Sequence, residues 1–334
     1  LFKNSKITFM WGKKQFDLVR KNFFDQNKVF VTGHPRFELI KTKYHYLYED
    51  EINIIKNLYG SFILINTNMS FGNNILGDEF IENNYKNRFK EIKKLIQLDK
   101  QKLDKVVELV FRLIKNSKKN IIIRPHPEEN QNYYKKIFNQ FNNVHVLYEG
   151  SVLPWIIASE HLIHPDCTTA IECLISGKIP LSLLPDNHNE EFLTYLPVKV
   201  SKCFHSTKIL SDYINENNPI KNNKVKKLKI IEDYFSTNLD SSDIIVKKIS
   251  DYTQSINLSS KDISILTYLN LKVKKVKSLF IPPRFSNSLS RQKLSGFDFE
   301  KISLLSSKIK QNNPDIENIK INKLNEFLYS FYSG

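Results

Sequence analysis

Short runs of β-branched and apolar residues alternate with longer segments of helical periodicity, and this alternation limits the fold more than any other feature. Strands separated by helices form βαβ units, whose parallel sheets carry helices on both faces. We therefore expect an α/β fold built on a Rossmann-like parallel sheet. The predicted strands are Val29–Thr32, Phe62–Ile65, Asn120–Ile123, Val144–Leu147, Leu162–His164 and Ile179–Leu184, and the predicted helices between them are Asn84–Asn116, Asn132–Phe141, Val152–Ser159 and Thr168–Ser176.

The flanks of this region divide the 334 residues into three predicted parts. Residues 1–27 hold one strand and one helix, which we interpret as the remnant of a preceding domain. Because the chain begins with Leu1 rather than Met, we expect that upstream sequence is missing. Residues 28–253 form the predicted sheet domain, in which 230–252 supplies one or two helices, and 254–334 form a helical tail. Within the tail we predict helices at Phe299–Gln311 and Ile319–Tyr332 and a turn at Pro282–Arg284.

The net charge of +15, from 50 Lys and Arg against 35 Asp and Glu, raises the question of an anionic partner. The densest basic runs are Lys221–Lys229 and Lys272–Lys277, and neither lies in a recognised nucleic-acid-binding motif. The abundance of Lys, Asn and Ile also fits an AT-rich genome. We interpret most of the charge as solvated surface and expect no nucleic-acid partner. Peripheral contact with an anionic membrane, or with a phosphorylated acceptor, is the alternative.

Several classes of protein are excluded by absent motifs. Three cysteines without a Cys-x-x-Cys pair give neither a disulfide framework nor a zinc knuckle. No apolar run approaches the roughly 18 residues that span a bilayer. The sequence has no G-x-G-x-x-G, Walker A, Asp-x-Asp or G-x-S-x-G motif, and His161 and His164 point to opposite faces of a strand. We therefore expect a site that uses no metal and no cofactor.

The predicted strand Asn120–Ile123 runs directly into Arg124-Pro125-His126-Pro127. Each proline fixes its own φ and favours an extended predecessor, so this exit is rigid. A guanidinium and an imidazole thus lie at the carboxyl end of a parallel strand, where α/β proteins bind ligands. We predict that Arg124, His126 and Pro127 contact a phosphate. The alternative is a structural turn in which Arg124 pairs with a carboxylate.

A second His-Pro pair ends the strand Leu162–His164, and a helix begins after it at Thr168 and Thr169. Asp166 or Thr168 can cap this helix, whose N-terminal N–H groups favour a phosphate. Glu172 lies one turn further along and can bond the hydroxyls of a ribose. The simpler alternative is a capping box between the threonines and Glu172, which stabilises a helix by about 1 kcal/mol.

Two further loops follow predicted strands. Asn66 and Asn68 offer amides to a sugar or a phosphate, although a loop of polar turn formers is an ordinary alternative. Gly150, followed by Ser151, lets a flat base approach the backbone closely. The full set of residues predicted to bind the donor is Arg124, His126, Pro127, Gly150, Ser151, His164, Thr168, Thr169, Glu172, Asn66 and Asn68.

Four motifs, in this order, give the chain a resemblance that covers roughly Lys6 to Pro185. They are GHPRFEL (Gly33–Leu39), ILINTNMSFGN (Ile63–Asn73), IIIRPHPEEN (Ile121–Asn130) and LIHPDCTTAIECLISGKIP (Leu162–Pro180). Together they resemble the bacterial surface carbohydrate biosynthesis family. More distantly they are similar to GT-B glycosyltransferases that use CMP-activated sugars, namely the sialyltransferases and capsule Kdo transferases, and to CDP-glycerol glycerophosphotransferases.

The resemblance implies a GT-B-like glycosyltransferase that uses a CMP-linked sugar in surface polysaccharide, lipopolysaccharide or capsule biosynthesis. In the CMP-sugar enzymes a His-Pro motif and a Ser/Thr pair hold the CMP phosphate. By resemblance these roles pass to His126 with Pro127 and to Thr168 with Thr169, and His126 would stabilise the leaving phosphate. The general base of such enzymes sits in the N-terminal domain, so we expect it outside this chain.

The resemblance also implies partners and a location. We expect a nucleotide-sugar donor, a saccharide or lipid-linked acceptor, and a cytoplasmic protein at the inner face of a bacterial membrane. Two alternatives stay open. One is a CDP-glycerol-type glycerophosphotransferase, and the other is a noncatalytic protein that binds nucleotide sugars.

Overall fold

The computed structural model describes residues 5–20, 28–186, 188–216, 224–255, 298–325 and 328–333. The chain divides into two compact units, Leu1–Ser242 and Asp243–Gly334. The basic run Lys272–Lys277, the predicted turn Pro282–Arg284 and residues 221–223 lie outside the described residues. Within the described ranges, no helix combines the length and the apolar character needed to cross a bilayer.

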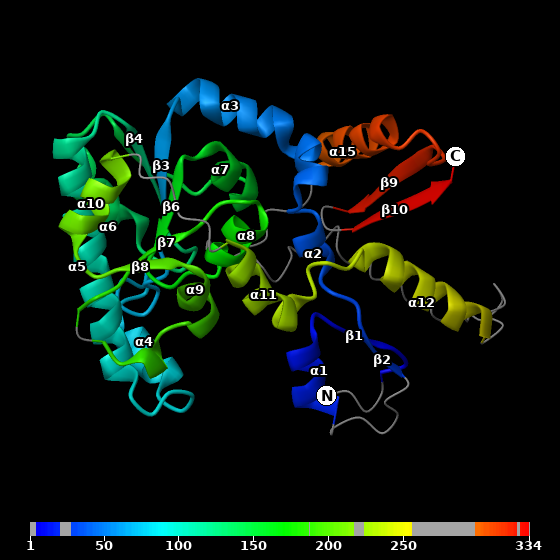
Figure 1. Cartoon of the computed structure of the whole chain (residues 1–334), viewed down its shortest axis with the longest axis horizontal. Coiled ribbons are helices and arrows are strands. Elements are labelled where there is room, and N and C mark those ends of the chain that lie inside the picture. Colours follow the sequence, from blue (N-terminus) through cyan, green and yellow to red (C-terminus); the bar gives the residue numbers. More distant parts are fainter. Residues whose placement is uncertain are drawn as a thin grey trace, which may run out of the picture. The chain divides into compact units, whose positions relative to one another are not determined.

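The first unit is built around a six-stranded parallel sheet with the strand order β5-β4-β3-β6-β7-β8 (Figure 1). Within this sheet the chain begins at the central strand β3, continues outward through β4 to β5, and then returns to β6 on the other side of β3. This is the doubly wound order of Rossmann-like folds, and the prediction of an α/β parallel sheet is confirmed. The strands are β3 (Phe62–Asn66), β4 (Asn120–Arg124), β5 (Val144–Val146), β6 (His161–His164), β7 (Leu181–Leu183) and β8 (Lys202–Phe204).

Helices cover both faces of the sheet, because alternate strand residues point to opposite sides. Ile63 and Ile65 share one core with α5, α6 and α10, whereas Phe62 and Leu64 share another with α3, α7 and α8 (Figure 1). Full burial of one such aliphatic side chain contributes about 1.5 to 3 kcal/mol. The covering helices are α3 (Glu49–Tyr59), α5 (Ile92–Asn116), α6 (Gln131–Phe138), α7 (Val152–Ala158), α8 (Thr169–Ile175) and α10 (Thr207–Asn215).

The remaining elements of this unit flank the sheet. The strand predicted at Val29–Thr32 forms β2, which pairs with β1 in a separate parallel pair rather than joining the large sheet. The predicted domain boundary at residue 27 therefore runs between two paired strands. The helix predicted at Asn84–Asn116 begins later, at Ile92 of α5, and the first two residues of the predicted range end a separate helix, α4. The flanking elements are β1 (Thr8–Met10), α1 (Lys13–Val19), β2 (Val29–Val31), α2 (Pro35–Glu38), η3 (Thr42–Tyr48), α4 (Asp78–Tyr85), η4 (Glu190–Phe192), α9 (Tyr195–Val200), α11 (Lys224–Phe235) and α12 (Ser241–Ser255), which continues into the second unit.

In the second unit, one of the two predicted helices is confirmed and the other is wrong. Helix α15 (Phe299–Asn312) matches the predicted helix of the tail. The helix predicted at Ile319–Tyr332 is wrong, because β9 (Ile319–Asn325) and β10 (Leu328–Ser333) form an antiparallel pair there. The segment starts with apolar and polar residues in strict alternation, a period of two that favours a strand.

A buried ion network lies beneath the exit of β6. The ammonium of Lys102 on α5 is 3.1 Å from both carboxylate oxygens of Asp166 and 3.2 Å from Asp99. Asp99 and Asp166 also accept the backbone N–H groups of Phe71 and Thr194, each at 3.0 Å. All three charged side chains are buried. Desolvation raises the pKa of Asp99, and the two carboxylates raise the pKa of Lys102. The network fixes Asp166 to α5.

Replacing Lys102 by Met should destabilise the protein strongly, because it leaves two buried carboxylates without their cation. We expect a loss of about 3 to 5 kcal/mol in the free energy of unfolding, measured by urea denaturation. Lys100→Met is the matched control, since Lys100 pairs with Asp78 at an exposed position, and its loss should stay below about 1 kcal/mol. Equal losses in the two variants would contradict this role.

Candidate functional site

The sheet changes its winding direction between β3 and β6, and doubly wound folds bind ligands at the carboxyl ends of the strands beside this point. Asn66 is the last residue of β3, and its side-chain amide donates a hydrogen bond to Thr169 Oγ1 at 3.1 Å. Thr169 is the first residue of α8, the helix that follows β6. Two of the predicted residues therefore meet across the switch point, although they lie more than one hundred positions apart.

Glu172 joins this pair from the first turn of α8. Its side chain is buried, and its Oε1 accepts a hydrogen bond from the guanidinium of Arg36, which itself is largely exposed. Burial raises the pKa of Glu172, while Arg36 lowers it. The carboxylate thus lies inside the site, with one oxygen held by a cation from the surface.

Arg36 is a site residue that we did not predict, although it lies in the Gly33–Leu39 motif. His34 caps the short helix α2 by accepting the backbone N–H of Arg36 at 3.0 Å, and Pro35 begins it. Gly33 has φ +77°, and a Cβ there would lie 2.4 Å from Ser241 Oγ, so only glycine fits this approach. The motif therefore aims Arg36 at Glu172.

Two oxygen atoms in this site have no hydrogen-bond partner. Asn66 Oδ1 and Glu172 Oε2 are two of the three buried side-chain polar atoms that lack a partner in the described part of the chain. Leaving such an atom unsatisfied costs about 1 to 3 kcal/mol, and more for a charged group. Both atoms are acceptors, because the amide nitrogen of Asn66 is already donating. A ligand that completes the site must therefore bring donors.

No described side chain caps α8, which differs from the helix start expected from the sequence. Thr168 occupies the N-cap position, but its side chain makes no capping hydrogen bond, and Asp166 is held by Lys102 and Thr194 instead. Glu172 bonds Arg36, so no capping box forms. Thr168 is exposed at the start of α8, which leaves its hydroxyl available to a ligand.

The loop after β4 is organised by a buried carboxylate, that of Glu129. It accepts hydrogen bonds from the hydroxyls of Thr67 and Tyr134 at 2.7 and 2.6 Å and from the N–H groups of Met69 and His126 at 3.0 and 3.2 Å. Desolvation raises its pKa, opposed by these donors. Glu129 thus ties the loop of His126 to the loop after β3, which carries Asn68.

His126 and Pro127 follow β4, as predicted, and both are half-buried. The imidazole Nδ1 of His126 accepts the backbone N–H of Glu128 at 3.3 Å. In the neutral ring this places the proton on Nε2. A proton on Nε2 is what the predicted contact of His126 with a phosphate requires.

Arg124 faces the protein. Its guanidinium donates to the backbone carbonyls of Glu149 and Gly150 at 2.7 and 3.2 Å and lies 5.1 Å from the ring centre of Trp155. Burial lowers its pKa to about 10. The side chain of Arg124 thereby fixes the loop of Gly150 and Ser151. Gly150 has a positive φ of 59°, which suits glycine. Gly150, Ser151 and Trp155 line a small pocket of about 160 Å³.

His164 is completely buried. Its Nδ1 accepts the backbone N–H of Cys167 at 3.2 Å, so Nε2 carries the proton and donates to Ser201 Oγ at 2.8 Å. Ser201 in turn donates to the carbonyl of Pro197 at 2.6 Å. Burial lowers the pKa of His164 to about 4. The structure therefore gives this histidine a positioning role behind the site.

The predicted residues thus fall into three groups. Asn66, Thr168, Thr169 and Glu172 converge at the switch point, where Arg36 joins them. His126, Pro127, Gly150 and Ser151 lie on the neighbouring loops, and Asn68 is half-buried on the loop after β3. Arg124 and His164 support these loops from inside. In the ranges that the structure describes, no group of three His, Cys, Asp or Glu residues is placed to hold a metal ion.

Comparison with known proteins gives distant likenesses only. No family model matches the chain, and no curated protein matches it. Among solved structures, the UDP-GlcNAc 2-epimerase of Methanocaldococcus jannaschii has a TM-score of 0.43 at 14% identity, covering 66% of this chain and 56% of that one. The wall teichoic acid polymerase TagF gives 0.46 at 16%, covering 74% and 58%. S. aureus MnaA with UDP gives 0.41 at 15%, covering 76% and 61%.

In all three comparisons this chain spans less than two thirds of the solved structure. TM-scores below 0.5 at these identities carry no argument about the activity of this chain.

The buried His164 should make stability depend on pH. Its pKa is about 4 in the folded chain against 6.5 as a model value. Between these values the unfolded chain binds a proton that the folded chain does not. Stability is therefore unaffected above pH ~6.5 and falls by about 3 kcal/mol as the pH drops toward 4. Urea unfolding of wild type and His164→Gln at pH 7.5 and 4.5 measures this effect. A pH dependence that is as large in the variant would rule out His164 as its source.

Proposed function

We propose that this chain is the donor-binding part of a glycosyltransferase that uses a nucleotide-activated sugar, with CMP as the nucleotide, in surface polysaccharide, lipopolysaccharide or capsule assembly. The observation that carries the proposal is the pair of unsatisfied acceptors, Asn66 Oδ1 and Glu172 Oε2, at the switch point of the sheet. A ribose offers two neighbouring hydroxyl donors, which is the complement that these acceptors need. A ribonucleotide combines such hydroxyls with phosphate, and a nucleotide-activated sugar is one such ligand.

The phosphate of this donor lies against the cations and hydroxyls at the same edge. Arg36 supplies an exposed guanidinium, and Thr168 and Thr169 supply hydroxyls beside the first N–H groups of α8. The base of the nucleotide lies toward Gly150 and Ser151. Gly150 has no Cβ and has open space beside it, and it lines the same pocket as Trp155.

In the proposed reaction an acceptor hydroxyl attacks the anomeric carbon of the sugar, and the bond from that carbon to the phosphate oxygen breaks. The electron pair of that bond stays on the departing phosphate. His126 donates its Nε2 proton in a hydrogen bond to this phosphate and so stabilises the charge that develops there. The carboxylate that takes the acceptor proton lies outside this chain, and the acceptor is a saccharide or a lipid-linked saccharide.

Calorimetric titration with CMP, CDP and UDP tests the ligand class. We expect cytidine nucleotides to bind more tightly than UDP, and we expect His126→Ala and Thr168→Ala to abolish binding. Glu172→Gln should weaken CMP binding by at least about tenfold, which corresponds to 1.4 kcal/mol. Glu160→Gln is the matched control, because Glu160 precedes β6 at the opposite end of the sheet.

A second ligand isolates the contact with the ribose. 2′-Deoxy-CMP lacks one hydroxyl donor, so it should bind wild type more weakly than CMP. The difference between the two ligands should shrink in Glu172→Gln, because the charged acceptor is gone. If no nucleotide binds to the folded protein, or if Glu172→Gln binds CMP as wild type does, the proposal is wrong.

A further inference from the structure

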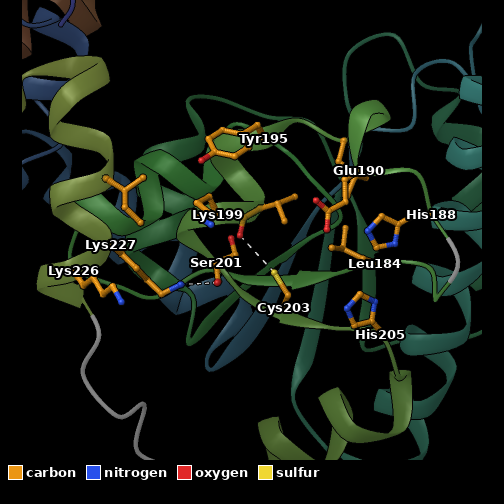
Figure 2. Close-up of a pocket in the computed structure, with 13 residues that line it drawn as sticks. Leu184, His188, Glu190, Tyr195, Lys199, Ser201, Cys203, His205, Lys226 and Lys227 are labelled. Carbon is orange, nitrogen blue, oxygen red and sulfur yellow. Dashed lines mark hydrogen bonds between the residues drawn. The ribbon is translucent and has the colours of Figure 1, made fainter. Parts of the chain in front are cut away.

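A second pocket lies away from the switch point, over the edge strand β8. Its volume is about 610 Å³, within the range of pockets that hold small ligands. Its walls come from α9, α11, β8 and the loops after β7 and β8 (Figure 2). None of the residues assigned to the donor lines this pocket. It is therefore a cavity separate from the donor site.

Cations dominate the charge of the pocket. Lys199 comes from α9, and Lys226 and Lys227 come from α11, against one carboxylate on Glu190 (Figure 2). Lys227 donates to the backbone carbonyl of Ser201 at 2.6 Å, and burial lowers its pKa. Both Lys199 and Lys226 are exposed, and neither forms an ion pair with any residue that the structure describes. The uncompensated charge favours an anion.

Two histidines line the opposite wall with a fixed orientation. The rings of His188 and His205 stack at 5.7 Å with an interplanar angle of 11°. The Nδ1 atoms of both rings lie 2.7 and 3.2 Å from the same acceptor, the carbonyl of Pro185, and so both carry a proton. In the neutral rings Nε2 is then an acceptor, so each ring can bind a hydroxyl of a ligand, such as the P–OH group of a singly ionised phosphate.

The rest of the lining is apolar. Leu184, Leu193, Val198 and Ile230 contribute aliphatic surface, and Tyr195 contributes an aromatic ring. A fully hydrated inorganic ion gains nothing from such a surface, whereas a ligand with an apolar part does. We infer that this pocket is a binding site for a small amphiphilic anion, in which a phosphate meets the lysines and histidines and an apolar group covers the aliphatic wall.

Cys203 reports on occupancy of the pocket. It lies in the middle of β8, its side chain lines the pocket, and it is the exposed cysteine of the chain, whereas Cys167 and Cys173 are buried. A bound ligand should shield its thiol, so the rate at which iodoacetamide alkylates Cys203 measures binding in the folded protein. Peptide mass analysis gives this rate separately for each cysteine, and the two buried thiols serve as internal controls for folding.

Hexyl phosphate is the test ligand. It should slow alkylation of Cys203 by about tenfold at a concentration ten times its Kd, by mass action. Inorganic phosphate should protect more weakly, because it lacks the apolar part. Hexyltrimethylammonium has the same chain and the opposite charge, and it should not protect.

Charge variants complete the experiment. The double variant Lys199→Gln/Lys226→Gln should weaken hexyl phosphate binding by at least about threefold, and Glu190→Gln should tighten it. Lys118→Gln/Lys208→Gln removes the same charge outside the pocket and should leave the Kd unchanged. Glu172→Gln should also leave protection unchanged, which separates this site from the donor site.

Equal protection by the cation, no protection by hexyl phosphate, or an unchanged Kd in the Lys199/Lys226 variant would overturn the inference. A further arm identifies the source of the phosphate. Protection by phosphatidylcholine vesicles that contain phosphatidic acid, but not by vesicles without it, assigns a lipid head group. Protection by hexyl phosphate alone assigns a free small molecule.

Discussion

A single buried carboxylate, on Glu129, joins the loop after β3, the loop after β4 and helix α6. It accepts the backbone N–H groups of Met69 and His126 and the hydroxyl of Tyr134. Burial raises the pKa of Glu129 and so disfavours its charge, while each donor favours the charged carboxylate. The loop after β3, which follows Asn66, and the loop that carries His126 are therefore held in one position relative to each other.

Much of the fold can be predicted from the local pattern of apolar and polar residues, and each wrong prediction has a local cause. The apolar runs of β3, β4, β6 and β7 predict strands because these strands are buried on both faces. Strand β8 was missed because Lys202-Cys203-Phe204 is short and partly polar, as an edge strand can be. The C-terminal hairpin was predicted as a helix, although Ile319 and Ile321 alternate with lysine and asparagine as in a strand.

The sequence predicts where in the sheet the candidate site lies, but it does not predict all of the side-chain contacts there. Residues after parallel strands meet at one edge, so Asn66, Thr169 and Glu172 could be assigned there from the sequence. Partner choice depends on distant segments, and nothing local indicates that Arg36 meets Glu172. Nor does a His-Pro pair reveal whether its ring faces a ligand or the core, as the buried His164 shows.

The lengths of the strands also bear on how the protein behaves at high concentration. The central strands β3 and β4 have five residues each, whereas the edge strands β5 and β8 have three. On β8 the exposed Lys202 places its ammonium 3.8 Å from the ring centre of Tyr213. An unpaired strand edge is a template for another chain, and short edges with a lysine on them are poor templates. Both edges of the sheet are therefore short, and the β8 edge also carries a lysine, so each is a poor template for the growth of an aggregate.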